Sequence, residues 1–304
     1  MSETLIRAED LSFYYDYHTP LEKLALDKIN LDIPQGQIIA LCGRAGSGKS
    51  TLIQQLDLLL TPTFGKIQFP GGYVLDMTPK IKRNRTIKPR KKPRIKDWKS
   101  IRKDIGVVFQ FPEDQLFKRR VIDDVMVGPL NFFKDESLAR KMAVEALADI
   151  GIDKSFFDRS PFTLSGGEKR KIAIAGVLAF NPKVLILDEP TVGLDRGGAR
   201  LLLDLIRNRN RKDGTTIILI THDMDLAYAV AERMVILQEG KIVLDSDIVS
   251  AFDSGDLIHQ AGLLPPRAFV YTRYLISQGL DIDPHLARDP DSLAREIERS
   301  VSHV

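Results

Sequence analysis

The sequence feature that most limits the fold is a glycine-rich loop between a buried strand and a helix. Residues Gly43–Ser50 fit the pattern G-x-x-x-x-G-K-[ST], they follow the apolar run Gln37–Cys42, and a helical pattern begins near Thr51. Two further apolar runs, Lys183–Leu187 and Thr216–Ile220, each precede a polar turn and a helix-compatible stretch. This alternation predicts an α/β fold with a mostly parallel sheet and helices on its faces.

The same loop predicts a polyphosphate ligand. Its glycines let backbone N–H groups converge on phosphate, Lys49 can reach the β- and γ-phosphates, and the Ser50 hydroxyl can bind Mg²⁺. The pattern arises by chance in roughly 1% of chains this long. We therefore predict a nucleotide site formed by Gly43, Arg44, Ala45, Gly46, Ser47, Gly48, Lys49, Ser50 and Thr51.

Two adjacent acids end another buried strand. Asp188 and Glu189 lie where parallel α/β sheets bind ligands, at the carboxyl end of the strand Lys183–Leu187. Beside a phosphate loop, we expect Asp188 to hold Mg²⁺ through its water shell and Glu189 to orient or deprotonate the attacking water. Alone, an Asp-Glu-Pro sequence is an ordinary turn.

A second anion site is predicted at Leu164–Glu168, where a helix begins. Ser165 is a suitable N-cap, and Gly166 and Gly167 leave backbone N–H groups uncovered. One chain with one nucleotide does not need two phosphate sites. We call Leu164–Glu168 the signature. A head-to-tail dimer, in which the signature of each chain closes over the nucleotide of its partner, would use both phosphate sites.

These motifs together resemble those of the ATP-binding cassette (ABC) ATPases. The family's order and separations are matched by Gly43–Ser50, Gln110, Leu164–Glu168, Asp188-Glu189, Gly193–Asp195 and His222. The resemblance covers about Leu5–Asp245. It implies an ABC nucleotide-binding domain over 1–245, with a P-loop core, an N-terminal antiparallel β subdomain and a helical subdomain at 115–163, and a C-terminal helical extension over 246–304.

The resemblance implies ATP and Mg²⁺ as cofactors and a role for each matching residue. Gln110 would act at Mg²⁺ and sense a membrane partner, His222 would contact the γ-phosphate, and Asp195 would join the dimer contact. Tyr15 would stack on adenine, with Tyr14 and Tyr17 as competitors. The residues that would contact the partner's ATP are Ser165, Gly166, Gly167 and Glu168, the last replacing the family's usual glutamine. Without the resemblance, Gln110 is a polar strand end and Thr221-His222 a helix cap.

Further stretches resemble the ATPases of energy-coupling factor (ECF) transporters. They include 107–117, 160–164, 173–178 and 261–263, and Thr19–Leu26 resembles the second of that system's two paralogous ATPases. The resemblance implies a heterodimer with a second ECF ATPase paralogue, a transmembrane coupling subunit, and substrate-binding membrane subunits for vitamins or metal ions. It makes Phe111–Phe117 the expected docking element. Core packing of Phe111 or Phe117 is the alternative.

Composition excludes several classes of protein. The single cysteine, Cys42, allows no disulfide framework, and we interpret it as a small buried hydrophobe. No apolar run approaches the ~18 residues that span a bilayer, and Met1–Asp10 lacks the regions of a signal peptide. We expect a protein peripheral to the cytoplasmic face of the cell membrane.

The charge is concentrated in one segment. Lys80–Lys103 carries 13 basic residues and one acid, so with a total of +3 the other 280 residues sum to about −9. We expect a solvated loop inserted at 78–103, with attraction to an anionic membrane leaflet as the second interpretation. Nucleic acid is the third interpretation, because Trp98 is the one aromatic residue of the segment and no others are interleaved with its charges to stack on bases. Three other functions remain: an ATPase of another ABC importer branch, a soluble ABC ATPase acting on nucleic acid, and a non-hydrolysing regulator, which Glu189 and His222 oppose.

Local patterns predict the remaining elements. Alternation at Ser12–Tyr15, Ile29–Ile33 and Lys66–Phe69 indicates a small antiparallel sheet. Glu136–Ile150 is predicted to be a helix that ends at Gly151. Its expected buried face is Leu138, Met142, Leu147 and Ile150. After Asp245 the pattern is helical, and Asp289-Pro290 begins a last helix whose predicted apolar stripe is Leu293, Ile297 and Val301.

Overall fold

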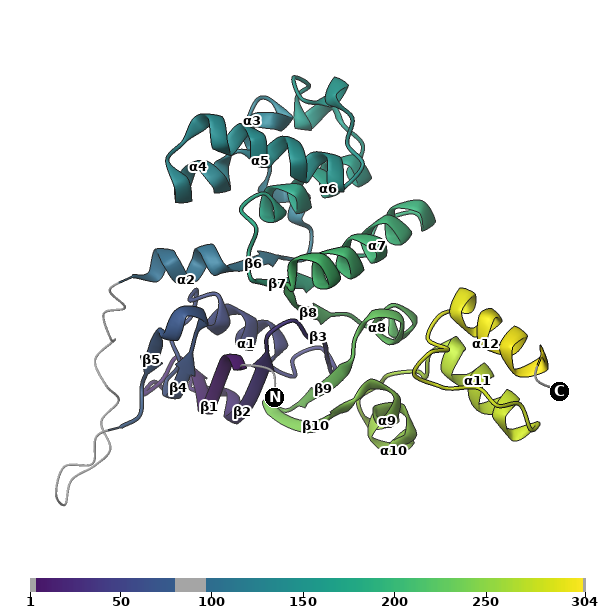
Figure 1. Ribbon diagram of the computed structural model, residues 1–304. Helices are drawn as coiled ribbons and strands as arrows, with labels where there is room; N and C mark the ends of the chain where they lie inside the picture. Colours follow the sequence, from purple (N-terminus) through teal and green to yellow (C-terminus); the bar gives the residue numbers. More distant parts are fainter. Residues whose placement is uncertain (1–3, 80–96, 303–304) are drawn as a thin grey trace, which may run out of the picture.

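The computed structural model describes residues 4–79 and 97–302 (Figure 1). Among them, four strands form an antiparallel sheet in the order β2-β1-β4-β5. The strands are β1 (Thr4–Tyr15), β2 (Lys23–Pro34), β4 (Phe64–Gln68) and β5 (Val74–Asp76). This confirms the predicted N-terminal sheet, although β1 and β2 are much longer than the alternating segments that predicted them.

The second sheet has the order β10-β9-β3-β8-β7-β6. Its strands are β3 (Ile38–Cys42), β6 (Ile105–Val108), β7 (Val184–Asp188), β8 (Thr216–Ile220), β9 (Arg233–Gln238) and β10 (Lys241–Asp247). All neighbours pair in parallel except β9 and β10. The predicted α/β fold with a mostly parallel sheet is therefore confirmed.

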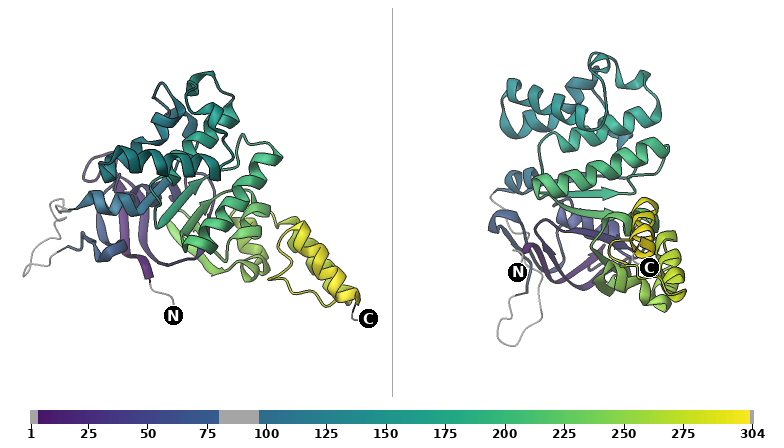
Figure 2. Two further views of the ribbon diagram at one scale, coloured as in Figure 1. Left: turned by 45° about the horizontal axis from the view of Figure 1, so that its top comes forward. Right: turned by 45° about the vertical axis from the view of Figure 1, so that its right-hand side comes forward.

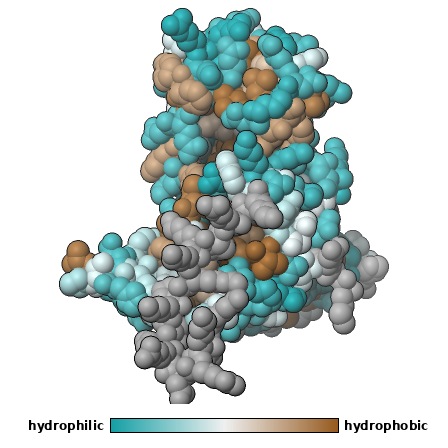
Figure 3. All heavy atoms as spheres, turned by 90° about the vertical axis from the view of Figure 1, so that its left-hand side faces the viewer, coloured by the Kyte–Doolittle hydropathy of each residue, from teal (hydrophilic) through white to brown (hydrophobic). Residues whose placement is uncertain are grey.

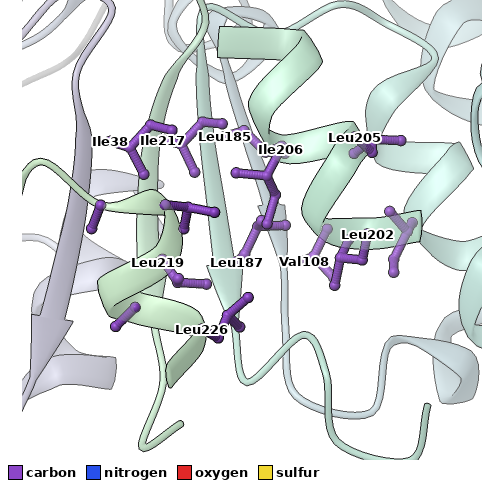
Figure 4. Packing of buried hydrophobic residues seen from close by; sticks show 14 of the residues in the cluster. Ile38, Val108, Leu185, Leu187, Leu202, Leu205, Ile206, Ile217, Leu219 and Leu226 are labelled. Atoms are coloured by element: carbon purple, nitrogen blue, oxygen red, sulfur yellow. The ribbon is translucent and has the colours of Figure 1, made fainter. Parts of the chain in front are cut away.

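Both faces of the parallel sheet are buried, which explains its uninterrupted apolar strands. Along β3, Ile38 and Ala40 pack against the helices, whereas Ile39 and Leu41 pack toward the antiparallel sheet. On the helical side, side chains of β7 and β8 meet Leu202 and its neighbours on α7 (Arg196–Asp213), as Figure 4 shows. Burying one such side chain contributes about 1.5–3 kcal/mol.

A helical subdomain lies above the sheet in Figure 1 and consists of α3 (Val121–Val125), α4 (Val127–Phe133), α5 (Glu136–Asp149) and α6 (Gly166–Leu178). The predicted buried face of α5 was partly wrong. Leu147 and Ile150 are buried, but Leu138 is exposed and Met142 only half-buried, and the other buried positions are Ala139, Ala143 and Ala146. Small residues on this stripe let α5 pack closely beside α6.

Part of the expected inserted loop is helical. Trp98–Asp104 forms α2, and the side chain of Asp97 caps it by accepting from the Ser100 N–H at 3.2 Å. Ile101 is buried, which fixes α2 against the core between the two sheets. The rest of the basic segment, through Lys96, lies outside the described residues, drawn in grey in Figure 3.

The chain ends in a helical extension, as predicted. Its elements are α9 (Ile248–Asp253), α10 (Gly255–Gln260), α11 (Arg267–Ser277) and α12 (Pro290–Ser302), and they follow β10, which ends at Asp247 rather than at 245. Helices α11 and α12 form a pair that projects from the core in Figure 2. Leu293 is buried and Ile297 packs beside it, but Val301 is exposed, so the expected apolar stripe ends one turn early.

No helix within 4–79 and 97–302 combines the length and apolar character needed to span a bilayer.

Candidate nucleotide site

The phosphate loop has a backbone that only glycine can adopt. Gly43 has a φ of +141°, and a Cβ there would lie 2.2 Å from the carbonyl oxygen of Leu237. Gly48 has a φ of +108°, and its Cβ would lie 2.8 Å from the carbonyl oxygen of Ala25. Gly48 precedes α1 (Lys49–Leu56) and provides no side-chain cap. The first N–H groups of α1 therefore remain available to an anion.

One cavity of about 760 Å³ brings together residues predicted from distant parts of the sequence. Its lining includes Tyr15, Gln110, Asp188, Glu189, His222 and the loop residues Gly43, Ala45, Gly46, Ser47, Gly48, Lys49, Ser50 and Thr51. Arg44 is the exception in the loop, because its side chain lies toward the turn at Gly262, where a Cβ would be 3.1 Å from Arg44 Nε. The volume and lining suit a nucleotide.

Lys49 is folded back onto its own loop. Its Nζ donates to the carbonyl oxygens of Gly43 at 2.6 Å and Arg44 at 3.0 Å. Burial lowers the pKa of Lys49, and the nearby charges of Asp188 and Glu189 act in the opposite direction. The ammonium is thus held at the mouth of the anion-binding loop, where phosphate oxygens could replace the two carbonyls.

Asp188 is a half-buried carboxylic acid at the end of β7. Its pKa is raised by burial and then by the charge of Glu189, which Lys49 only partly offsets. Among the described residues, no cluster of three His, Cys, Asp or Glu side chains is arranged to hold a metal. For a metal ion, the cavity offers the Asp188 carboxylate together with the Ser50 hydroxyl and the Gln110 amide. That oxygen donor set fits Mg²⁺ in a site completed by substrate phosphates and water.

Glu189 is held in a strained backbone conformation beside Asp188. Its φ is +48°, and its N–H donates to the carbonyl oxygen of Ile220 at 2.8 Å. The carboxylate accepts from the His222 N–H at 3.1 Å and from Thr221 Oγ1 at 3.3 Å, and His222 Nδ1 lies 2.8 Å from Oε1. Both oxygens of Glu189 are thereby oriented by the end of β8.

His222 reaches the cavity from the turn before α8 (Met224–Val230). Among the described residues, the imidazole contacts Glu189 through Nδ1. Because the side chain is 76% exposed, its other ring edge faces solvent. The alternative interpretation of Thr221-His222 as a helix cap is wrong. The cap of α8 is Asp223, whose carboxylate accepts from the Leu226 N–H at 3.0 Å.

Arg170 is a site-supporting residue that the sequence analysis missed. It lies on α6, its side chain is 2% exposed, and it donates to the carbonyl oxygens of Glu189 at 2.7 Å and Pro190 at 3.2 Å. Its Nη1 is 3.7 Å from Glu113 Oε2, in the segment that follows Gln110. The only sequence signal was an arginine at a buried position of a helix, which requires partners that the sequence alone does not identify.

Tyr15 is the tyrosine that faces the cavity. Its hydroxyl is 3.0 Å from Thr51 Oγ1, and its ring is 37% exposed beside Phe13. Tyr14 and Tyr17 pack on each other and on Phe64, and neither lines the cavity. The competing assignments for the adenine-stacking residue are therefore disfavoured by position.

The signature residues Ser165–Glu168 do not line this cavity. Ser165 and Glu168 form a capping box at the start of α6, in which the Ser165 N–H donates to Glu168 Oε2 at 2.8 Å. These hydrogen bonds hold the pKa of Glu168 below its usual value. A Cβ at Gly166 or Gly167 would meet nothing within 4 Å. Asp195, also outside the cavity, caps α7 by accepting from the Gly198 N–H at 2.7 Å.

Two predictions on hydrophobic residues have clear outcomes. Phe111 and Phe117 are 48% and 61% exposed, so the core-packing alternative is wrong for both.

Cys42 is fully buried, and burial raises the pKa of its thiol to about 12. Its interpretation as a small buried hydrophobe is confirmed.

Known proteins share these features. Residues 26–192 match the sequence profile of the ABC transporter family. The chain is 40% identical to the energy-coupling factor transporter ATP-binding protein EcfA2 of Clostridium perfringens over 92% of this chain and 93% of that protein. It is 38% identical to EcfA2 of Spiroplasma kunkelii, over 95% and 90%. The chain belongs to the ECF transporter ATP-binding proteins of the ABC transporter family.

Solved structures agree with this membership. The ECF ATPase matches cbiO1 of Clostridium perfringens, described as part of the ABC transporter complex cbiONQ, with a TM-score of 0.67 and 34% identity, over 90% of this chain and 100% of that one. It matches the dimeric post-hydrolysis ATP-binding cassette MJ0796, bound to ADP and Pi, with a TM-score of 0.66 and 27% identity, over 80% and 99%. The protein is an ABC-type ATPase that binds ATP.

Proposed function

We propose that this ECF ATPase forms one half of a pair of ATPases that close around ATP and hydrolyse it to drive uptake by a membrane complex. The main support is that the motifs lie in two separate places on the chain. Lys49, Asp188, Glu189 and His222 share one cavity, whereas the signature at Ser165 presents its open N–H groups elsewhere. A second ATPase facing head to tail would supply the missing anion site to each nucleotide.

Within the cavity, each side chain has a separate task. The loop N–H groups and Lys49 would bind the phosphates, and Tyr15 would stack on the adenine. Glu189 would accept the proton of the attacking water, since its carboxylate is already aimed by Thr221 and His222. His222 would hold that carboxylate in place and reach toward the γ-phosphate with its exposed ring edge.

The donor set described above would hold Mg²⁺ through Ser50, Gln110 and Asp188. When bound, Mg²⁺ would neutralise phosphate charge during hydrolysis. In this chain, Asp188 would keep the ion beside Lys49, and Gln110 would connect the site to the segment that begins at Phe111.

The proposed partners are a second ECF ATPase paralogue, a transmembrane coupling subunit and substrate-binding membrane subunits. The names of the relatives support this, because they place EcfA2 in ECF transporters and cbiO1 in a transporter complex. Exposed Phe111 and Phe117 on the segment after Gln110 offer apolar anchors to a coupling subunit. The protein would then lie peripherally on the cytoplasmic face of the membrane, and the cargo would be vitamins or other micronutrients.

Affinity isolation from detergent-solubilised membranes tests the assembly. The tagged chain should co-purify with a related ATPase and a transmembrane coupling subunit, and a Phe111→Ser/Phe117→Ser variant should lose the membrane subunit while keeping the ATPase. Leu21→Ser, at a 77% exposed position between β1 and β2, is the matched control. Recovery of a conventional importer permease, without a second ATPase, would replace the ECF assembly with another importer branch.

A further inference from the structure

Helix α8 connects the catalytic histidine to the C-terminal extension. It begins two residues after His222, and its cap is Asp223. The His222 N–H and imidazole both contact Glu189. The direction in which the chain enters α8 therefore fixes where His222 stands relative to Glu189.

The extension holds the first turn of α8. The carboxylate of Asp225 accepts two hydrogen bonds from Arg267, the first residue of α11, one from the backbone N–H and one from Nε, both at 2.7 Å. The charges also face each other, which strengthens the contact. The Arg267 side chain is 80% exposed and is not part of the core, so it can be truncated without leaving a cavity. We call the contacts of Arg267 and Arg288 with α8 the two clamps.

The last carbonyl groups of α8 accept hydrogen bonds from one arginine of the extension and from one arginine of α7. Arg288, in the segment before α12, donates through Nε to the carbonyl oxygen of Tyr228 at 2.7 Å and through Nη2 to that of Ala231. Arg207 donates to the carbonyl oxygen of Ala229 at 3.2 Å and to Asp289 Oδ2 at 2.6 Å. Guanidinium groups thus satisfy carbonyls that a helix leaves unpaired at its end.

The middle of α8 is embedded in the extension as well. Tyr228 is fully buried, its hydroxyl donates to the carbonyl oxygen of Pro284 at 3.1 Å, and its ring packs edge-on to Phe252 and Phe269. Figure 1 shows α8 between the parallel sheet and the α11–α12 pair. Both ends and the centre of the helix therefore depend on residues after Asp247.

We propose that Arg288 and Arg267 are positioning residues for ATP hydrolysis, which act through α8 to hold His222 against Glu189. The extension would then set the turnover rate from a place that touches neither nucleotide nor base. The inference rests on the proposed roles of Glu189 and His222. A displacement of about 1 Å in a catalytic group can reduce the rate by about 10²-fold, so loss of one clamp should be measurable.

The test is ATP turnover by the assembled full-length complex. Arg288→Ala should lower kcat by about 10-fold with the KM for ATP changed less than about 2-fold, because the phosphate loop is untouched. Arg288→Lys should recover part of the rate, since an ammonium can still donate to one carbonyl. Arg295→Ala is the control, because Arg295 is exposed on α12 and has no hydrogen bond or ion pair among the described residues.

A double-mutant cycle separates positioning from general destabilisation. In a His222→Ala background, measured under single-turnover conditions, Arg288→Ala should cause no further loss. Amide hydrogen exchange over residues 221–231 should be faster in Arg288→Ala alone. An equal fold-loss with and without His222, or wild-type kcat in Arg288→Ala, would overturn the inference. Wild-type turnover in His222→Ala would instead refute the proposed role of His222.

If Arg288→Ala fails to fold, Arg267→Ala gives the same test, because Arg267 on α11 contacts the first turn of α8. It should lower kcat less, with the same absence of effect in the His222→Ala background. Wild-type kcat in a folded Arg267→Ala and no change in exchange over 221–231 would overturn the inference for that clamp.

Discussion

Replacing Arg170 with methionine should disturb the catalytic turn and the segment after Gln110 at the same time. The guanidinium binds the carbonyl oxygens of Glu189 and Pro190 and lies 3.7 Å from Glu113 Oε2, yet the Arg170 side chain is only 2% exposed. Methionine keeps most of the apolar stem and removes every donor. The variant therefore tests the charged contacts rather than the packing volume.

The magnitude follows from these contacts. A hydrogen bond from a charged donor contributes about 1.5–3 kcal/mol, and removing one partner of a buried ion pair costs about 3–5 kcal/mol because the other charge stays buried. Glu113 Oε2 is buried without a hydrogen-bond partner, so it is the charge that would be stranded. At about 2–4 °C per kcal/mol, Arg170→Met should lower Tm by about 6–20 °C.

Thermal unfolding of the variant, with and without Glu113→Gln, is the assay. If a stranded carboxylate causes the loss, Glu113→Gln in the Arg170→Met background should restore about 1–3 kcal/mol, whereas Glu113→Gln alone should not stabilise. ATP turnover should fall in Arg170→Met, since Glu189 loses a backbone contact. A Tm within about 1 °C of wild type, or no rescue by Glu113→Gln, would show that Arg170 does not neutralise a buried charge on Glu113.

Three further predictions concern the phosphate loop, the adenine contact and the buried Cys42. Gly43→Ala should lower the free energy of unfolding by at least about 2 kcal/mol more than Gly46→Ala, as measured by thermal unfolding. Of these two positions, a Cβ at Gly43 would clash with backbone, whereas a Cβ at Gly46 meets nothing within 4 Å. Equal losses of stability would contradict the loop geometry. Tyr15→Ala should weaken ATP binding by about 10-fold in calorimetry and Tyr14→Ala should not, since only Tyr15 lines the cavity; the reverse would reassign the adenine contact. Native Cys42 should resist iodoacetamide at pH 8 until the protein unfolds, because burial both covers the thiol and raises its pKa to about 12. Rapid labelling of the folded protein would contradict this burial.

The sequence was sufficient for elements that short-range chemistry defines. The loop Gly43–Ser50, the strand ends at Asp188 and the capping residues Ser165 and Asp289 each have a local pattern with one physical reading. The convergence of Tyr15, Gln110 and His222 on the loop followed from the family's motif order, not from the residues alone. The structure supplies their common cavity.

Features that depend on tertiary contacts were not predictable. The buried stripe of α5 runs over alanines rather than the larger Leu138, because the distance to α6 decides which residues are covered. Ile101 is buried within an otherwise basic segment, and its packing between the two sheets, together with the Asp97 cap, holds Trp98–Asp104 as a helix. The partners of Arg170 and Arg288 are backbone carbonyls far away in sequence, which leave no trace in side-chain patterns.

Turnover by the assembled complex carrying Glu189→Gln in this chain tests directly whether Glu189 is the base in an ATP site completed by a second ATPase. Glutamine keeps the size of the side chain and one acceptor oxygen but accepts protons far less readily. If Glu189 is the base, ATP should stay bound at this site while its hydrolysis falls by about 10²–10⁴-fold. Hydrolysis at the wild-type rate from this site would contradict it.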